Sequence, residues 1–481
     1  MSLRHVPEGR GHAYERDPDQ RVPVRPVAGE PVELRVTAPA DVDAVEVELG
    51  DGRRLAAVRR GDAVPDDDPR YGRTRAAGEG HLSSASTYDR AGRRAWGVTV
   101  DAEGDLLRYR FVAGDEATDW FECAVRRDRW RASFPLAPGD RVVGFGERFD
   151  ALDQRGRFVD TAVYDQYKGQ GARSYLPMPF ALVVGERSYG IHVETSRRCF
   201  FDVGVSDPTK LVVECDEPAE VVLLEGTPAE IVRAFSERTS LELAAPPDWI
   251  YRLWLSGNEW NSEARVRAEV AAAADAGIPV GTLVIEAWSD EETFTAWNGA
   301  ELWPDPKRLV DDLHEAGIKV LLWQIPLAPA ESDQRVMVER GYCVLNEDGT
   351  PYRNPGGWFH DALLLDFTSE EATDWWLAKR RYLVDELGID GFKTDGGEHA
   401  WPSSLRYADG TRGAETNNRY PVLYQAAYHR LARVTFSRAG FTGSGGFPCH
   451  WAGDEDSTWE AFRASILAGL TAAISGVFYW G

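Results

Sequence analysis

The stretch Gly388-Ile389-Asp390-Gly391-Phe392-Lys393-Thr394-Asp395-Gly396-Gly397-Glu398 predicts how the second half of this chain folds. Ile389 and Phe392 belong to a short apolar segment, just long enough for a buried parallel strand. Asp395 arrives where that strand ends, and the two glycines after it allow a sharp turn that leaves its carboxylate in open space. Since α/β enzymes place their chemistry at the carboxyl ends of parallel strands, Asp395 is a candidate catalytic residue. The alternative is an aspartate that ends a strand and caps the next helix.

Length and charge restrict the classes of protein to consider. A chain of 481 residues exceeds one ordinary domain, and two to three are expected. The formal net charge of -24 disfavours nucleic acid and anionic membranes as partners, because both need neutralising cations. The apolar run at residues 464–481 is broken by glycine and serine, so it predicts a buried helix and strand rather than a membrane span. A homo-oligomer is left open.

Cysteine and histidine usage indicates the compartment and argues against a metal site. The five cysteines form no CxxC pair, which suits a reducing compartment. The first ten residues are charged and lack the apolar core of a secretory signal, so we expect a cytoplasmic protein. The nine histidines show no HExxH spacing, and we predict neither a metal nor a cofactor.

The first half of the chain is rich in predicted strands. Residues 1–131 contain period-two runs at 32–36 and 45–49, which predict an immunoglobulin-like β-sandwich. Residues 132–245 predict a second β-sandwich. Its long polar and aromatic loop at residues 164–177 is either a binding element or interface packing.

From residue 246 to 481 the pattern alternates between strand and helix, which predicts a (β/α)₈ TIM barrel. About seven of the eight strands can be counted, so the barrel is expected to be incomplete at its C-terminal end, as if the sequence were cut short. The predicted strands are 252–256, 282–286, 319–323, the stretch quoted above, 434–436, 448–451 and 477–480. The predicted helices are 262–276, 306–316, 369–387, 418–432 and 458–475.

Asp454 is the predicted partner of Asp395. It follows the sixth strand and precedes a helix, and a barrel brings all such strand ends to one face. Retaining glycosidases need two carboxylates about 5–5.5 Å apart, one as nucleophile and one as proton donor. Lys393 favours the charged form of Asp395, and Trp451 with its apolar neighbours raises the pKa of Asp454. Alternatively Asp454 or Asp456 caps the following helix, the role that we predict for Asp456.

Several motifs resemble glycoside hydrolase family 31. Residues 391–398 (Gly-Phe-Lys-Thr-Asp-Gly-Gly-Glu) resemble its nucleophile motif, whose usual form is GFKTDFGE. Residues 436–439 (Phe-Ser-Arg-Ala) and 450–454 (His-Trp-Ala-Gly-Asp) resemble its sugar-binding arginine and its acid/base segment. Residues 145–149 and 175–180 look like parts of its N-terminal β-domain. The similarity runs from about residue 142 to the end of the sequence.

The resemblance implies a retaining exo-α-glycosidase that removes terminal α-linked glucose or xylose from oligosaccharides or glycosides. In this interpretation Asp395 attacks the anomeric carbon to form a glycosyl-enzyme, and Asp454 protonates the leaving oxygen and then activates water. Arg438 hydrogen-bonds sugar hydroxyls, with an ordinary ion pair as its alternative. Trp323 and Trp451 wall the pocket, with core packing as the alternative for Trp323. The predicted substrate-binding residues are Glu286, Trp323, Lys393, Arg438 and Trp451.

Three departures from the family pattern keep other interpretations open. Gly396 replaces an aromatic residue beside the nucleophile and is expected to open room in the pocket. Glu286 stands where the family supplies an aspartate to sugar hydroxyls, and the segment that completes the family's barrel beyond Gly481 is absent. The alternatives are a transglycosylase or lyase on the same scaffold, a non-catalytic carbohydrate-binding or inactive relative, and specificity for α-galactosides or amino sugars. In each case the partner is a small carbohydrate.

Overall fold

The computed structural model of the chain describes residues 3–68, 92–239, 246–478 and 480–481. The chain divides into two compact units. The first comprises Met1–Ala132 together with Glu214–Pro218 and Pro355–Trp358, and the second comprises the remainder. The boundary expected after residue 245 borders residues 240–245, which lie outside the described residues.

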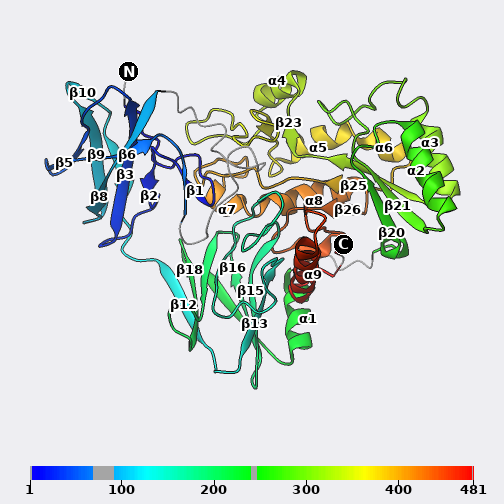
Figure 1. Cartoon of the computed structure of the whole chain (residues 1–481), viewed down its shortest axis with the longest axis horizontal. Coiled ribbons are helices and arrows are strands. Elements are labelled where there is room, and N and C mark those ends of the chain that lie inside the picture. Colours follow the sequence, from blue (N-terminus) through cyan, green and yellow to red (C-terminus); the bar gives the residue numbers. More distant parts are fainter. Residues whose placement is uncertain (1–2, 69–91, 240–245, 479) are drawn as a thin grey trace. The chain divides into compact units, whose positions relative to one another are not determined.

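The first unit is built from antiparallel strands (Figure 1). They are β1 (Glu15–Arg16), β2 (Arg21–Val22), β3 (Pro31–Pro39), β4 (Glu46–Leu49), β5 (Arg54–Ala56), β6 (Val58–Asp62), β7 (Asp66–Asp67), β8 (Arg93–Asp101), β9 (Leu106–Ala113), β10 (Glu116–Ala117) and β11 (Phe121–Ala124). One sheet has the order β2-β3-β8-β6, and a second has the order β10-β9-β4-β5 with β11 also paired to β9. Val36, Val47, Trp96 and Tyr109 belong to their common core. Strands β1 and β7 pair in a two-stranded sheet. The runs predicted at 32–36 and 45–49 lie in strands β3 and β4.

A β-rich part follows, which belongs to the second unit except for residues 130–132 and 214–215. Its elements are β12 (Trp130–Pro135), β13 (Arg141–Gly146), β14 (Phe158–Asp160), β15 (Pro177–Val184), β16 (Tyr189–Glu194), β17 (Cys199–Val203), β18 (Lys210–Cys215), β19 (Glu220–Glu225) and α1 (Pro228–Thr239). The strands form two four-stranded sheets, β12-β18-β17-β14 and β13-β15-β16-β19. Helix α1 packs on the second sheet, where Phe235 stacks on Phe180 with ring centroids 3.9 Å apart.

Alternating strands and helices complete the second unit. They are η1 (Asp248–Tyr251), β20 (Leu253–Gly257), α2 (Glu263–Asp275), β21 (Val280–Ile285), α3 (Pro306–Glu315), β22 (Lys319–Gln324), β23 (Leu327–Ala328), α4 (Glu331–Arg340), β24 (Leu363–Leu364), α5 (Glu370–Ala378), α6 (Arg381–Asp385), β25 (Gly391–Thr394), α7 (Gly413–Thr416), α8 (Tyr420–Leu431), β26 (Thr435–Ser437), η2 (Ser444–Gly446) and α9 (Trp459–Ile474). Strands β20, β21, β22, β25 and β26 form one parallel sheet in that order.

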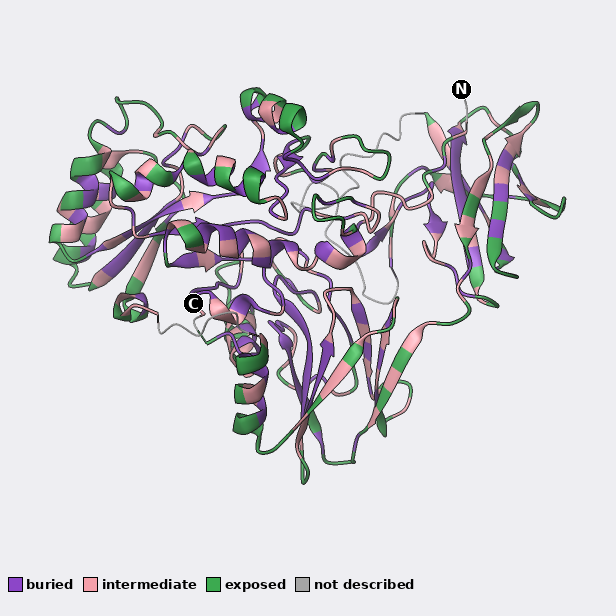
Figure 2. Cartoon of the chain, turned by 180° about the vertical axis from the view of Figure 1, so that it is seen from behind, coloured by how far each residue is buried: buried purple, intermediate pink, exposed green. Residues whose placement is uncertain are grey.

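This parallel sheet confirms the predicted fold class, β-rich domains followed by an incomplete TIM barrel. The sheet is largely buried. Helices α2 and α3, which pack on β21 and β22, expose their outer faces, whereas α8, which packs on β25 and β26, is mostly buried (Figure 2). Helix α2 begins as predicted, because Ser262 Oγ accepts a hydrogen bond from the backbone N–H of Arg265. Gly277, with a φ of 71°, ends it. None of the described helices has the length and apolar composition to cross a membrane.

Two secondary-structure predictions need correction. The strands predicted at 448–451 and 477–480 are reduced to isolated parallel bridges, Ser437 with His450 and His450 with Trp480, although Tyr479 lies outside the described residues. Pro448, at the start of the first of these, has no N–H to donate to a ladder. The single helix predicted at 369–387 is divided into α5 and α6, because the chain turns where it buries Arg380 against Gln324.

Candidate active site

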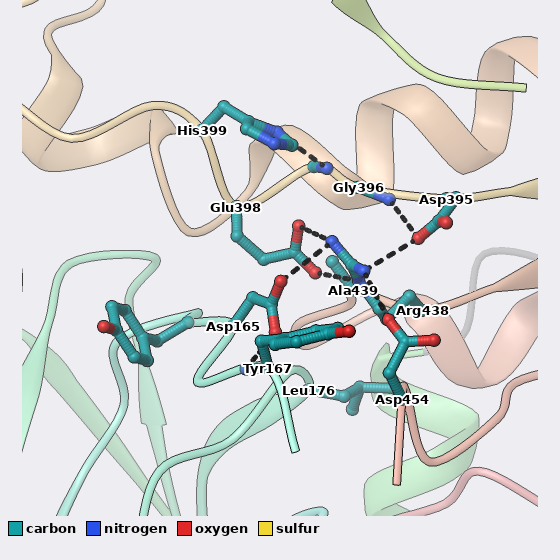
Figure 3. A network of polar contacts seen from close by, with 12 residues as sticks. Asp165, Tyr167, Leu176, Asp395, Gly396, Glu398, His399, Arg438, Ala439 and Asp454 are labelled. Carbon is teal, nitrogen blue, oxygen red and sulfur yellow. Dashed lines mark hydrogen bonds and ion pairs between the residues drawn. The ribbon is translucent and has the colours of Figure 1, made fainter. Parts of the chain in front are cut away.

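Arg438, directly after β26, is the centre of a buried polar network at the carboxyl end of the parallel sheet (Figure 3). Its Nη1 lies 3.1 Å from Oδ1 of Asp395 and 3.6 Å from Oδ2 of Asp454. Its Nε and Nη2 donate to the two carboxylate oxygens of Glu398, at 2.9 and 3.1 Å. Nη2 also lies 3.4 Å from Oδ2 of Asp165. One guanidinium therefore contacts four carboxylates, and we call these five residues the arginine cluster.

Asp395 is held by several donors at the end of β25. Trp323 Nε1 donates to its Oδ2 at 2.9 Å, and the backbone N–H of Gly396 donates to Oδ1 at 2.8 Å. Burial alone would raise the pKa of this carboxyl. The charges of Arg438 and Lys393, together with these hydrogen bonds, outweigh burial and hold the pKa of Asp395 below its usual value. An ionised carboxylate at this position suits a nucleophile.

Lys393 lowers the pKa of Asp395, as the sequence predicted, but its direct ion pair is with another residue. It lies two residues earlier on β25, on the same face, and its Nζ forms an ion pair with Glu286 Oε1 at 2.6 Å. Ser256 also donates to that oxygen, at 2.6 Å. Lys393 therefore contributes to the charge of Asp395 over a longer distance, and the larger favourable charge comes from Arg438.

Two predicted aromatic residues lie beside these ion pairs. Trp451 is buried, and its ring centroid lies 4.5 Å from Nζ of Lys393. Trp323 contacts Phe294 with ring centroids 5.3 Å apart, but its indole N–H points to the Asp395 carboxylate. The structure thus brings the predicted substrate-binding residues next to the arginine cluster, and their contact with sugar stays a prediction.

Asp454 differs from Asp395 in exposure and in number of donors. Its side chain is 38% exposed, against 11% for Asp395. Partial burial raises the pKa of Asp454, the nearby charge of Asp395 raises it further, and Arg438 opposes both. The direction agrees with the sequence-based expectation for a proton donor, and burial is its largest cause.

The two aspartates are close enough to act on one bond. Their oxygens contact the same Nη1 atom of Arg438, at 3.1 Å and 3.6 Å, so they cannot lie further apart than these two contacts combined. The distance between the two carboxylates is therefore compatible with the roughly 5–5.5 Å of retaining glycosidases. It is too short for most of the range of about 6.5–9.5 Å found in inverting glycosidases.

The helix-capping role predicted for Asp456 is wrong. Thr458 caps α9, since its side chain accepts a hydrogen bond from the backbone N–H of Ala461. Asp456 instead forms an ion pair with Lys168 Nζ at 2.9 Å. The carboxylate is used for this contact between loops, and a threonine nearer the helix takes the cap position.

The room expected at Gly396 is filled. Gly396 has a φ of 77°, and a Cβ atom there would lie 2.8 Å from Cε1 of His399 and 3.4 Å from Cδ of Pro326. The backbone N–H of Gly397 points to Nδ1 of His399 at 3.4 Å. The imidazole ring therefore lies against the face on which a larger residue at position 396 would need space.

The sequence prediction missed two members of the arginine cluster, Asp165 and Glu398. Glu398 lies three residues after Asp395 in the stretch that predicted the barrel strand. Asp165 lies in the polar and aromatic loop between β14 and β15, which was singled out only as a whole. Neither could be connected with Arg438 without the fold, because the three residues come from separate loops. In the part of the chain that the structure describes, no group of three His, Cys, Asp or Glu side chains is arranged to hold a metal ion.

Three family descriptions match the chain. Residues 243–481 match the glycosyl hydrolases family 31 TIM-barrel domain. Residues 9–113 match the 1,3-alpha-isomaltosidase-like N-terminal domain, and residues 91–202 match the glycosyl hydrolase 31 N-terminal galactose mutarotase-like domain.

Named relatives and a solved structure show the same similarity. A 1,3-alpha-isomaltosidase of Kribbella flavida is 44% identical over 550 residues, an alignment that covers 100% of this chain and 75% of the relative. An isomaltosyltransferase of Sporosarcina globispora is 35% identical over 73% of this chain and 36% of its own length. The cycloalternan-degrading enzyme from Trueperella pyogenes, solved in complex with cycloalternan, superimposes with a TM-score of 0.89 at 38% identity, over 100% of this chain and 76% of that one.

Proposed function

Because the chain belongs to glycoside hydrolase family 31, we propose that it is a retaining exo-acting α-glucosidase that hydrolyses α-linked gluco-oligosaccharides through a glycosyl-enzyme. The observation that carries the proposal is the position of Arg438 Nη1 between the carboxylates of Asp395 and Asp454. Two aspartates at one cation, one with a lowered and the other with a raised pKa, are the pair that double displacement requires.

In the first half-reaction Asp395 attacks the anomeric carbon while Asp454 protonates the leaving oxygen. Asp395 is ionised because Arg438 lies 3.1 Å from it and Trp323 donates to it. In the second half-reaction Asp454, now ionised, takes a proton from water, and the water oxygen displaces Asp395 from the sugar. Glu286, Lys393 and Trp451 bind the sugar next to this pair.

The substrate proposal follows the relatives. The 44% identity to a 1,3-alpha-isomaltosidase favours an oligosaccharide in which an isomaltosyl unit is joined by an α-1,3 bond. The isomaltosyltransferase supports transfer to a sugar acceptor as a second outcome on the same glycosyl-enzyme. Release of xylose is the weaker proposal, because the α-xylosidase of Emericella nidulans is 27% identical. The three-part division at residues 131 and 245 and the cytoplasmic location stay predictions.

The test is hydrolysis of an α-1,3-linked isomaltosyl oligosaccharide, with nitrophenyl α-glucoside and α-xyloside in parallel. Proton NMR in the first minutes should show the α-anomer of the released sugar, because two displacements retain configuration. A first-formed β-anomer would contradict double displacement. Measurable sugar affinity without turnover would support the carbohydrate-binding alternative.

A further inference from the structure

Glu398 is a buried member of the arginine cluster with no part in the proposed chemistry. The side chains of Glu398 and Arg438 are 0% and 1% exposed. Both carboxylate oxygens of Glu398 accept from the guanidinium, one from Nε at 2.9 Å and one from Nη2 at 3.1 Å. Such two-point pairing fixes the plane of a guanidinium as well as its position. The nitrogen left over is Nη1, the atom that contacts both aspartates.

We propose that Glu398 is a positioning residue that holds Arg438 so that Nη1 stays between Asp395 and Asp454 through both half-reactions. The inference rests on the proposed double displacement. Glu398 itself touches neither the sugar nor the reacting atoms. It acts only through Arg438.

The need for a fixed guanidinium follows from where the negative charge goes. In the first half-reaction the bond from Asp395 to the anomeric carbon forms, the glycosidic bond breaks, and the proton of Asp454 passes to the leaving oxygen. The charge thus leaves Asp395, which becomes a neutral ester, and appears on Asp454. In the second half-reaction water gives a proton to Asp454, its oxygen bonds to the anomeric carbon, and Asp395 departs as the anion. A cation that contacts both oxygens follows this charge without moving.

An arginine not held in this way would not remain between the two groups. A guanidinium prefers two parallel hydrogen bonds to one carboxylate. Asp395 and Asp165 both lie within reach of Arg438, at 3.1 and 3.4 Å. If Arg438 rotated onto either of them alone, the anion formed on Asp454 would lose its partner at 3.6 Å. Glu398 prevents this by occupying the two other donating nitrogens.

The groups around Glu398 make its charge sensitive to pH. Burial, with smaller contributions from Asp165 on the β14–β15 loop and Asp395 on its own segment, raises the pKa of Glu398 to about 7, against the opposing charge of Arg438. Glu147, which follows β13, also faces Glu398. Burial raises the pKa of Glu147, and the charge of Glu398 raises it further. The pair with Arg438 is therefore about half charged near neutral pH and fully charged only at alkaline pH.

Two substitutions separate positioning from charge. Glu398→Gln keeps the shape, removes the charge and turns an amide N–H₂ toward the guanidinium. Glu398→Asp keeps the charge but is one methylene shorter, so it cannot hold Nε and Nη2 together. If Glu398 positions Arg438, both variants should lower kcat, by about 10²-fold for Gln and roughly 10-fold for Asp, with KM changed less than about threefold. Both should also move the alkaline limb of the pH profile upward, because Asp454 loses Arg438.

Two other outcomes would contradict the positioning role. If Glu398 acts by its charge alone, Glu398→Asp matches the unmodified enzyme, and the alkaline limb of Glu398→Gln moves to lower pH. If Glu398 serves only stability, both variants unfold at lower temperature with unchanged kcat and pH profile. The matched control is Asp333→Asn, which breaks a partly buried ion pair between α4 and Lys379 at the end of α5. It should lower the unfolding temperature and leave both kinetic readouts unchanged.

A measurement on the unmodified protein tests the positioning role of Glu398 even if the variants do not fold. The full chain is treated with 5-fluoro-α-glucosyl fluoride, and mass spectrometry shows whether a glycosyl-enzyme accumulates. Absence of both adduct and turnover would end the proposed function. If the adduct forms, its crystal structure should show Glu398 still paired with Nε and Nη2 and Nη1 still in contact with Asp454. A broken pair, or an Nη1 turned away from Asp454, would overturn the positioning role alone.

Discussion

The segment after β25 and the segment after His450 each supply one aspartate to Arg438, yet they surround it differently. Asp395 accepts hydrogen bonds from Trp323, from the N–H of Gly396 and from Arg438, and its side chain is 11% exposed. Asp454 has Arg438 as its one hydrogen-bonding or ion-pair partner among the described residues, and its side chain is 38% exposed. Asp395 is the more buried of the two, so its charged form is kept by its shorter contact with Arg438, by the charge of Lys393 and by its two further hydrogen bonds, in that order.

The two aspartates are the same residue type, but their surroundings suit them to two different roles. Burial raises the pKa of both aspartates, since it opposes the charged form. At Asp395 the charges of Arg438 and Lys393, together with the hydrogen bonds from Trp323 and Gly396, outweigh burial. At Asp454 the same two charges, without hydrogen bonds, do not. The lowered pKa of Asp395 should set the acid limb of the activity profile, and the raised pKa of Asp454 its alkaline limb.

Asp395→Ala should have the largest effect, because it removes the nucleophile. We expect kcat/KM to fall by about 10⁴-fold or more, which an assay with nitrophenyl α-glucoside measures. Azide should restore product formation as the β-glucosyl azide, since the small anion enters from the face that Asp395 occupied. A variant that retains more than a tenth of the activity would remove Asp395 from the mechanism.

Asp454→Ala should reduce the rate according to the leaving group. With oligosaccharides, whose leaving alcohols need a proton, we expect a loss of about 10²–10⁴-fold. With dinitrophenyl α-glucoside, whose leaving group needs none, the first step should be nearly unaffected and azide should yield the α-glucosyl azide. Equal losses for both substrates would argue that Asp454 is structural.

Some features of the fold and the site could be predicted from the sequence, and others could not. β25 and the start of α2 were predictable because they depend on local apolar runs, glycines and a serine cap. Arg438 as the common partner of four carboxylates was not, since Asp165 and Asp454 reach it from loops far apart in the chain. In the same way the effect of Lys393 on Asp395 was predictable, whereas its ion pair with Glu286 across the sheet was not.

Trp323→Phe should bring the pKa of Asp395 closer to that of Asp454, because it removes one hydrogen-bond donor from Asp395. A hydrogen bond to a charged group contributes roughly 1.5–3 kcal/mol, so the pKa of Asp395 should rise and the acid limb should move up by about one to two pH units. kcat/KM should fall roughly 10-fold. Trp376→Phe is the control, because the Trp376 indole donates to Tyr428, away from Asp395. An acid limb that moves equally in both variants would indicate a general packing effect.

Glu286→Gln should give the smallest shift of the acid limb, and this shift should be toward lower pH, opposite to that of Trp323→Phe. It removes the charge that faces Lys393 Nζ at 2.6 Å, so more of the lysine's positive charge acts on Asp395. The pKa of Asp395 should fall further and the acid limb should move down, by about half a pH unit or less, because charges that are not in contact interact weakly. If Glu286 also binds a sugar hydroxyl, KM should rise as well. The alkaline limb should move down only slightly, because Lys393 lowers the pKa of Asp454 less than Arg438 does. An acid limb that moves up instead would mean that Lys393 needs Glu286 to keep it near Asp395, and the two ion pairs would then be one network.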